Sequence, residues 1–533
     1  MAEPTAISLR SRWLSWGRAP VSLLLPASAV AVVSLLPVAY LLIREGLDPA
    51  RLARLLATPS TGELVRNTAL LALSVTLACV VVGVGLAVLV TCTDLPARRV
   101  WMVLFTLPLG VPAFVATYTW VAAGYEWAPH STLLYGLGGA TLVLTLSLYP
   151  YVYLPTVAAL RGLDATQEGV ARALGRGPAL AFIEVTLPQL RRAISGGALI
   201  VALHMLAEFG ALELLRFRTL TTAIVQRATV LGSLDSARAL SIVLTFAALI
   251  LLAGDAWLFR HALAPVRVGG GVAQARAPWR LGRWAPLCLA LGTVVVGVAL
   301  GVPLYGMLRG FVTIASGSAT IDAGALAAAT ATTIQYAVAA ALLVTLAALP
   351  ISLLMVRYPG RGVLAIERAA WVAHSLPGVV VALGLVFFAV RWLHPLYQTS
   401  ALLVVGYAIL YLPIAVGAQR VGLGQASLHF DQIARTLGRS PVATFLSVTL
   451  PLALPGIVAG IMLVVLNVGK ELTMTLLLRP TGVHTLATKL WTTTNGEVLD
   501  FTAAAPYAIT MIVITAVPTS LLIRASLSPA KPA

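Results

Sequence analysis

Residues 171–188 read ARALGRGPALAFIEVTLP, and residues 434–451 read ARTLGRSPVATFLSVTLP. Eleven of the 18 positions are identical at a constant separation of 263 residues. The register continues beyond these stretches in the pairs Gly197 and Gly460, Glu208 and Glu471, and Leu215-Arg216 and Leu478-Arg479. A gap-free match over more than forty positions indicates an internal duplication, so we expect two similar halves.

The composition places both halves in a membrane. Of the 533 residues, 59% are hydrophobic and only 10% are charged, and the mean hydropathy is +0.93. A soluble domain carries about 25% charged residues, and a disordered chain is richer still in polar residues. The composition therefore excludes a water-soluble enzyme and a disordered protein. It leaves room for about a dozen helical spans of roughly 20 residues each.

Apolar segments predict these spans in two sets of six. The first set lies at about 21–43, 67–92, 100–124, 132–160, 193–215 and 239–259, and the second at about 284–308, 331–356, 369–391, 401–419, 453–477 and 504–523. We predict an all-α polytopic membrane protein with about 12 transmembrane helices in two six-helix repeats, residues 1–259 and 284–533. An Arg- and Gly-rich cytoplasmic linker, residues 260–283, joins them. An even number of spans per repeat makes the repeats parallel.

The charge distribution predicts the orientation. The chain has 36 Lys and Arg residues against 19 acidic ones, a net charge of +17. Of the 36, 23 fall in the two tails and the alternate loops on one side, so we expect both termini in the cytoplasm. These charges are dispersed among apolar runs, which indicates a partner membrane and no nucleic acid. The three cysteines and seven histidines are scattered, so we expect no disulfide, metal site or cofactor in this chain.

Each repeated stretch lies in a cytoplasmic loop between the fourth and fifth spans of its half. Gly175 is expected to end a short helix in a left-handed conformation, and Leu187-Pro188 to begin the next span. A short helix held between two spans can transmit force from a soluble partner. An amphipathic helix that only lies on lipid headgroups is the alternative. The close duplication favours a docking role, since lipid binding does not require matching detail.

These loops resemble the cytoplasmic EAA loop of binding-protein-dependent ABC importer permeases, which reads Glu-Ala-Ala, three residues, Gly, nine residues, Ile, one residue, Leu-Pro. The first copy is Gly169-Val170-Ala171, Gly175, Val185 and Leu187-Pro188, and the second is Gln432-Ile433-Ala434, Gly438, Val448 and Leu450-Pro451. The acid departs from the pattern. Glu168 stands one place early in the first copy, and Gln432, preceded by Asp431, replaces it in the second.

Other stretches are similar to the fused, twelve-span permeases of ferric-iron ABC importers, over nearly the whole chain beyond the first span. They are Asn67-Thr68, TDLPARRVWMVLFTLPLGVPAFV at 93–115, YPYVYLPTVAALRGLD at 149–164 and GKELTMTLLLRPTGVHTLATKLW at 469–491. Iron(III) is therefore the favoured substrate. Thiamine permeases share the fused layout, so thiamine or another small solute is the alternative.

The resemblance implies a type I ABC importer permease in a bacterial cytoplasmic membrane. It implies that a separate ATPase subunit, in two copies, binds ATP and Mg and docks on the two loops, and that an extracytoplasmic binding protein delivers the substrate. This chain has no G-x-x-x-x-G-K-[ST] loop, and we expect a transport subunit and not an enzyme. The implied coupling residues are Glu168, Ala171, Arg172, Gly175, Leu187, Pro188, Asp431, Gln432, Ala434, Arg435, Gly438, Leu450 and Pro451.

Glu208 and Glu471 are repeat-equivalent acids at the edges of apolar spans. A carboxylate inside a membrane is costly and tends to face a cavity or a cation. They are candidates for the pathway or gate. An ion pair within or between helices, such as Glu471 with Arg479, is an equally weighted alternative.

Three further interpretations concern single residues and the class of transporter. We interpret His204 and His374 as packed or hydrogen-bonded. For Pro108, Pro112, Pro377 and Gly378 we favour ordinary helix kinks, and the alternative is a helix break that forms a gate. A secondary transporter of two six-span halves also fits the composition. It does not predict the duplicated loop, and it would place more charges in mid-span.

Overall fold

The computed structural model describes residues 19–46, 58–163, 166–230, 232–258, 278–317, 322–494 and 501–527. Within these ranges the regular structure is helical, apart from one isolated bridge between Thr93 and Trp279. Most of the predicted linker, 260–277, lies outside the described residues, as do most of the two tails.

Each helix of the first half recurs about 263 residues later in the second. The first half contains α2 (Val21–Gly46), α4 (Pro59–Cys92), α5 (Arg98–Leu104), α6 (Ala113–Trp127), α7 (Gly136–Leu148), α8 (Pro150–Gly162), α9 (Thr166–Ala173), α10 (Pro178–Ala181), α11 (Leu187–Ala207), α12 (Gly210–Leu214), α13 (Leu220–Thr229) and α14 (Leu234–Leu258). The second contains α15 (Ala285–Val296), α16 (Val302–Ala315), α17 (Ala323–Arg357), α18 (Arg361–His374), α19 (Gly378–Trp392), α20 (Ser400–Gln425), α21 (Leu428–Thr436), α22 (Pro441–Thr444), α23 (Leu450–Gly469), α24 (Thr473–Leu478), α25 (Leu486–Thr494) and α26 (Phe501–Leu527).

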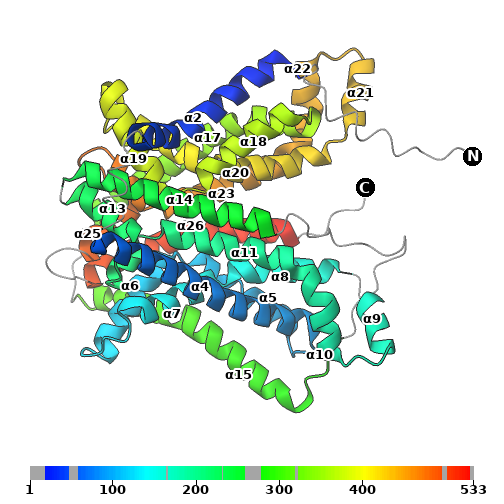
Figure 1. Cartoon of the computed structure of the whole chain (residues 1–533), viewed down its shortest axis with the longest axis vertical. Helices are drawn as coiled ribbons and strands as arrows, with labels where there is room; N and C mark the ends of the chain where they lie inside the picture. The colour runs from blue at the N-terminus through cyan, green and yellow to red at the C-terminus, as the bar shows by residue number, and fades with distance from the viewer. Residues whose placement is uncertain are drawn as a thin grey trace, which may run out of the picture.

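The two halves run in the same direction through the membrane. Figure 1 shows α9 and α10 at the same end of the molecule as α21 and α22, whereas α13 and α25 lie at the opposite end. Among the described residues, eight helices are long and apolar enough to span a bilayer, and three bent pairs of helices bring the number to 11. α26 accounts for the remaining predicted span, with a shorter apolar stretch at Thr502–Pro518. The structure therefore agrees with the predicted all-α polytopic fold.

The prolines do more than kink the helices, so the prediction of ordinary kinks was wrong. The helix pairs at 98–127 and 361–392 bend by 90° and 100°. Pro112 and Pro377 stand at these bends with ψ of 137°, outside the helical range, and each is the N-cap of the next helix. Proline has no N–H to continue a helix and disfavours helical conformation in the residue before it. The predicted spans 100–124 and 369–391 are therefore broken helices.

The first helix of each half packs against the opposite half. α2 contacts α17, α18 and α19, and the rings of Tyr40 and Phe388 meet edge to face at 5.7 Å. The contact with α19 is close: a Cβ at Gly384 would lie 2.5 Å from the carbonyl oxygen of Pro37. Small residues allow helices to approach at this distance in a membrane.

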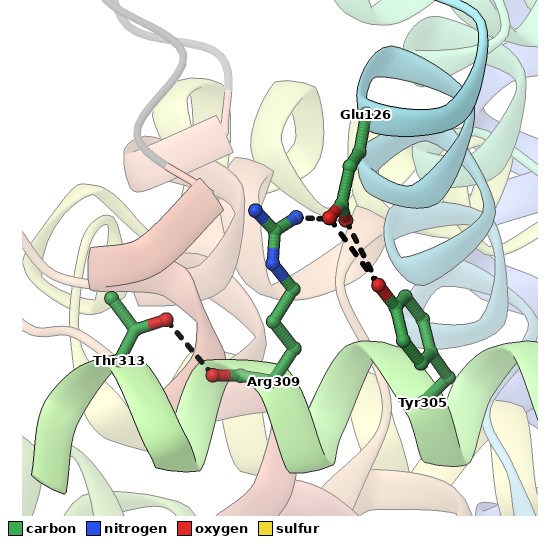
Figure 2. Close-up of polar contacts among 4 residues, drawn as sticks. All are labelled: Glu126, Tyr305, Arg309 and Thr313. Atoms are coloured by element: carbon green, nitrogen blue, oxygen red, sulfur yellow. Dashed lines mark hydrogen bonds and ion pairs between the residues drawn. The ribbon is translucent and has the colours of Figure 1, made fainter. Parts of the chain in front are cut away.

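The reciprocal contact joins α16 to α6 of the first half. Glu126 forms an ion pair with Arg309, and the hydroxyl of Tyr305 lies 3.3 Å from both oxygens of the same carboxylate (Figure 2). Thr313 Oγ1 donates to the carbonyl oxygen of Arg309 at 2.9 Å, and the rings of Trp127 and Tyr305 lie 5.2 Å apart. Because the ion pair is partly exposed, the packing of α16 contributes more to this contact than the charges do.

Replacing Gly384 by Ala should destabilise the protein by about 1–3 kcal/mol, because the added methyl group overlaps the α2 backbone. Thermal unfolding in detergent measures the effect. Gly417→Ala in α20 is the matched control, since nothing lies within 4 Å of its Cβ position. Equal stability of the two variants would contradict the close packing of α2 on α19.

Candidate functional site

The two repeated loops fold into the same series of short elements. The first forms α9, a turn at Gly175, α10 and the π-helical turn η4 (Phe182–Thr186), which leads into α11. The second forms α21, a turn at Gly438, α22 and η8 (Phe445–Thr449), which leads into α23. Prolines 188 and 451 directly follow the π-helical turns, inside helices that run unbroken over Pro178–Ala207 and Pro441–Gly469, so the fifth span of the first half begins before Leu187-Pro188 and not at it.

Glycine ends the short helix in both loops. Gly175 and Gly438 have φ of +88° and +80°. The N–H of Gly175 donates to Arg172 O at 3.0 Å, and the N–H of Arg176 donates to Ala171 O at 3.1 Å, and both bonds recur in the second loop. This is the Schellman pattern, in which glycine takes the left-handed position without strain. The expectation that Gly175 ends the helix is confirmed.

The acid of each loop holds the loop together. Thr186 Oγ1 donates to Glu168 Oε2 at 2.8 Å, and Thr449 Oγ1 donates to Asp431 Oδ1 at 2.8 Å. Glu168 is only 4% exposed. The two acids are separated by 263 residues, so each ties the short helix to the π-helical turn in the same way. Aligning each loop to the Glu-Ala-Ala pattern does not place Glu168 opposite Asp431. Aligning the two halves at a separation of 263 residues does.

Apolar side chains face outward from the same loops. Val170 and Leu174 are 55% and 80% exposed, and their repeat equivalents Ile433 and Leu437 are 56% and 77% exposed. Gln432 is exposed as well. Apolar groups gathered on the surface mark a contact site. The four exposed apolar residues were not among the predicted coupling residues. Of those that were, two are buried, Glu168 and Ala434, and six are exposed, namely Arg172, Gly175, Gln432, Arg435, Gly438 and Pro451.

Glu208 and Glu471 stand where a long helix breaks and a short one begins. Glu208 follows α11, and its Oε1 accepts the N–H of Ala211 at 3.1 Å. Glu471 follows α23 closely, and its Oε1 accepts the N–H of Met474 at 3.0 Å. Each carboxylate therefore caps the start of α12 or α24. The spans predicted at 193–215 and 453–477 end earlier than expected, because the chain turns at these acids.

The two acids converge from opposite halves. A Cβ at Gly210, two residues after Glu208, would lie 2.7 Å from Cδ2 of Leu472, the residue after Glu471, so the two helix breaks pack against each other. Tyr411 of α20 donates to Glu471 Oε2 at 2.9 Å, and His204 Nε2 lies 3.6 Å from Glu208 Oε2. A Cβ at Gly378, at the bend before α19, would lie 3.6 Å from Glu471 Oε1. Broken helices at membrane depth occur where backbone lines a cavity or is buried in protein.

The proposed pairing of Glu471 with Arg479 does not form. Arg479 Nη1 instead donates to Val483 O at 2.9 Å and lies 2.7 Å from His484 Nδ1. In the first half, however, Glu208 lies next to a basic side chain of the same segment, because His204 precedes it by four residues. His374 has a hydrogen-bonding partner, as expected, with Nδ1 2.5 Å from the carbonyl oxygen of Leu410.

A cavity of about 450 Å³ lies between the halves, on the side opposite the repeated loops. Both halves line it, with Phe209 and Glu213 from the first and Arg479 and Trp491 from the second. Trp491 contacts Phe209 at 4.8 Å and Phe114 at 6.2 Å, centroid to centroid. Phe209 is the residue after Glu208, so this aromatic cluster connects the lining of the cavity to the first helix break.

Among the described residues, no group of three or more His, Cys, Asp or Glu side chains has a geometry that could hold a metal ion. Two carboxylates with a tyrosine and a histidine nearby make a polar centre where the two halves meet. Sequence reasoning identified both acids. It missed Tyr411 and Trp491, because neither stands out in an apolar sequence and their contacts join distant segments.

Comparison with known proteins agrees with this geometry. The family described as "Binding-protein-dependent transport system inner membrane component" matches residues 80–258 and 346–528, one match in each half. The Fe(3+)-transport system permease protein FbpB 2 of Haemophilus influenzae is 33% identical over 508 residues, covering 95% of this chain and 98% of that protein.

Two further relatives match a smaller part of the chain. The putative ferric transport system permease protein FbpB 1 of Haemophilus influenzae is 26% identical over 67% of this chain and 58% of its own length. The molybdenum transport system permease protein ModB of Mycobacterium tuberculosis is 30% identical over 43% of this chain and 91% of its own length. The duplicated loops, the duplicated family match and the full-length similarity lead to one conclusion. The chain belongs to the family of binding-protein-dependent ABC transport permeases, with both permease repeats fused in one polypeptide.

Proposed function

We propose that this chain is the permease of an iron(III) importer and that the substrate passes between its two halves, past Glu208 and Glu471. The observation that carries the proposal is the contact between the two helix breaks, Gly210 against Leu472, where each acid accepts an N–H of the short helix that follows it. Similarity over nearly the full length to an Fe(3+)-transport permease supports the choice of substrate. As an ABC importer permease, the chain is a multi-pass membrane protein and not itself an enzyme.

The sign of the charge separates iron from molybdate, which half-length relatives carry by name. A carboxylate that meets a cation can ionise and attract it, whereas it repels an oxyanion. Tyr411 adds a phenolic oxygen beside Glu471. Carboxylate and phenol oxygens suit a hard cation better than an anion. The same argument leaves thiamine, an organic cation, as the alternative substrate.

Permeases of this family work with an ATPase subunit and a substrate-binding protein. We place one ATPase copy on each repeated loop, two in all, with ATP and Mg bound by those subunits. The exposed pairs Val170 with Leu174 and Ile433 with Leu437 supply the apolar contact. This arrangement puts both termini in the cytoplasm and the 450 Å³ cavity on the outer face, where a binding protein delivers its load.

Alternating access follows as a population shift between two states. We place the outer gate at the packed rings of Trp491, Phe209 and Phe114. Closure of the ATPase pair would draw the two loops together and part these rings. The bends between α5 and α6 and between α18 and α19 are the positions at which this motion would open or close the substrate pathway.

The substrate assignment is tested by uptake into vesicles that contain the permease with its ATPase. Binding protein is supplied loaded with iron(III), with thiamine or with molybdate. We expect ATP-dependent uptake with iron(III) alone. Uptake of thiamine alone would replace iron by the alternative substrate, and ATP-independent uptake driven by a proton or sodium gradient would favour a secondary transporter.

Leu174→Asp and Leu437→Asp should each remove one ATPase copy from the purified complex, because a charge replaces an exposed apolar contact. We expect binding at the altered loop to weaken about tenfold or more, the usual effect of losing a central interface residue. Subunit stoichiometry by native mass spectrometry measures this. Leu133→Asp, an equally exposed leucine in the loop between α6 and α7, is the matched control. Retention of two copies by all three variants would exclude the loops as docking sites.

Neutralising the acids in the double variant Glu208→Gln and Glu471→Gln should reduce iron uptake at least about tenfold, since charge lost at the pathway costs more than 1.4 kcal/mol for a passing cation. Glutamine keeps an oxygen that can accept the capping N–H, so the helix breaks should persist. Uptake at saturating binding protein is the measurement. Glu63→Gln, at an exposed position of α4, is the control. Unchanged uptake in the double variant would exclude a pathway role.

A further inference from the structure

The two docking loops are braced against the preceding long helix in different ways. In the second half, Arg357 ends α17 and reaches Asp431 of α21, with Nη2 and Oδ2 2.9 Å apart. The arginine side chain is only 9% exposed. Asp431 also accepts the hydroxyl of Thr449. One carboxylate thus joins the long helix, the short helix and the π-helical turn of the second loop.

The first half lacks the residues for this ion pair. The positions equivalent to Arg357 and Asp431 are Asp94 and Glu168, which are both acidic. Two acids cannot pair as ions, so the end of α4 needs another connection to its loop.

The end of the linker supplies that connection. The N–H of Trp279 donates to Cys92 O at 2.7 Å, and the N–H of Asp94 donates to Trp279 O at 3.1 Å. Asp94 Oδ1 accepts the N–H of Leu281 at 2.8 Å. The two backbone bonds form the parallel bridge between Thr93 and Trp279 that follows α4, and the bond to the Asp94 side chain adds to it. They fix residues 278–281, the linker end, against the first half.

From this bridge the indole ring of Trp279 reaches the first docking loop. It meets Phe182 edge to face, with centroids 5.4 Å apart and an interplanar angle of 85°. Phe182 begins the π-helical turn η4 and is 9% exposed. Its repeat equivalent Phe445 is less completely buried, although it begins η8 in the same way. The tryptophan covers a residue that the second loop leaves partly open.

We propose that the linker end, residues 278–281, is a structural part of the first ATPase docking site and holds its loop as Arg357 holds the second. This inference rests on the proposed docking of an ATPase at each loop. Trp279 and Arg357 are positioning residues, since each acts on the partner through the loop that it braces. The linker therefore contributes to coupling at one site and not at the other.

Site-specific cross-linking to the ATPase in the assembled membrane complex separates the two sites. Ala173→Cys and Thr436→Cys place reporters at equivalent exposed positions of α9 and α21. Cys288 is first replaced by serine, while Cys79 and Cys92 are buried and are kept. Each reporter is combined in turn with Trp279→Ala and with Arg357→Gln, and cross-linking to the ATPase is quantified.

We expect a reciprocal pattern. Trp279→Ala should lower cross-linking at position 173 about fivefold or more and change position 436 less than twofold, and Arg357→Gln should do the reverse. Trp279→Phe, which keeps an aromatic edge for Phe182, should restore position 173. Trp284→Ala changes an exposed tryptophan just beyond the linker end and should affect neither reporter.

Equal losses at both reporters, or no loss at either, would overturn the inference. Asp94→Ala is an independent second test, because it removes the acceptor for Leu281 without touching an aromatic contact. It should reproduce the pattern of Trp279→Ala, and an unchanged position 173 would count against the brace. If neither reporter cross-links to the ATPase in the otherwise unaltered chain, the proposed docking of the ATPase at these loops is wrong. That result is distinct from a failure of the linker end to brace the first loop.

Discussion

A helix cannot stop inside a bilayer unless something takes its free N–H and C=O groups. This constraint applies where the helices that run from Pro178 to Ala207 and from Pro441 to Gly469 end and a short helix follows each. Glu208 and Glu471 meet it by capping α12 and α24 with their own carboxylates. The groups that stabilise the breaks are thus the same two groups that we propose to lie on the substrate pathway.

Much of the architecture could be predicted from the repeat. The constant separation of 263 residues predicted two parallel halves, the matching loops and the turn at Gly175, because these depend on local sequence and on span number. The sharp bends at Pro112 and Pro377 had a signal in the sequence, yet proline alone does not distinguish a kink from a break. The packing of α2 on α19 and the contact of Tyr411 with Glu471 had no signal, since both join segments far apart in the chain.

The capping role of Glu208 and Glu471 could be predicted from the sequence only in part. Their equivalence was visible, and so was the expense of a carboxylate in an apolar span. The position of the break was not, because α12 and α24 are only five or six residues long and carry no periodicity of their own. Pairing of Glu471 with Arg479 was reasonable from spacing alone. The loop after α24 instead turns the arginine toward Val483 and His484.

Fusion of two repeats has let equivalent positions diverge. Position 94 is an aspartate that holds the linker end, and position 357 is an arginine that holds a docking loop. The contact of Glu126 with Arg309 joins α6 to α16, whereas the matching positions, Ala389 and Gly46, cannot form an ion pair. In a chain with two identical halves, equivalent positions would make the same contacts. In this chain they make different contacts.

The exchange of first helices also sets an order of assembly. α2 is made first, but the surface of α17, α18 and α19 that it covers is more than 300 residues further along the chain. At a synthesis rate of about 5–20 residues per second, α2 resides in the membrane for on the order of tens of seconds before its partners exist. α16 meets α6 as soon as it is inserted, since α6 precedes it. The N-terminal helix must therefore be stable alone in lipid, and the protein becomes complete only when the second half closes around it.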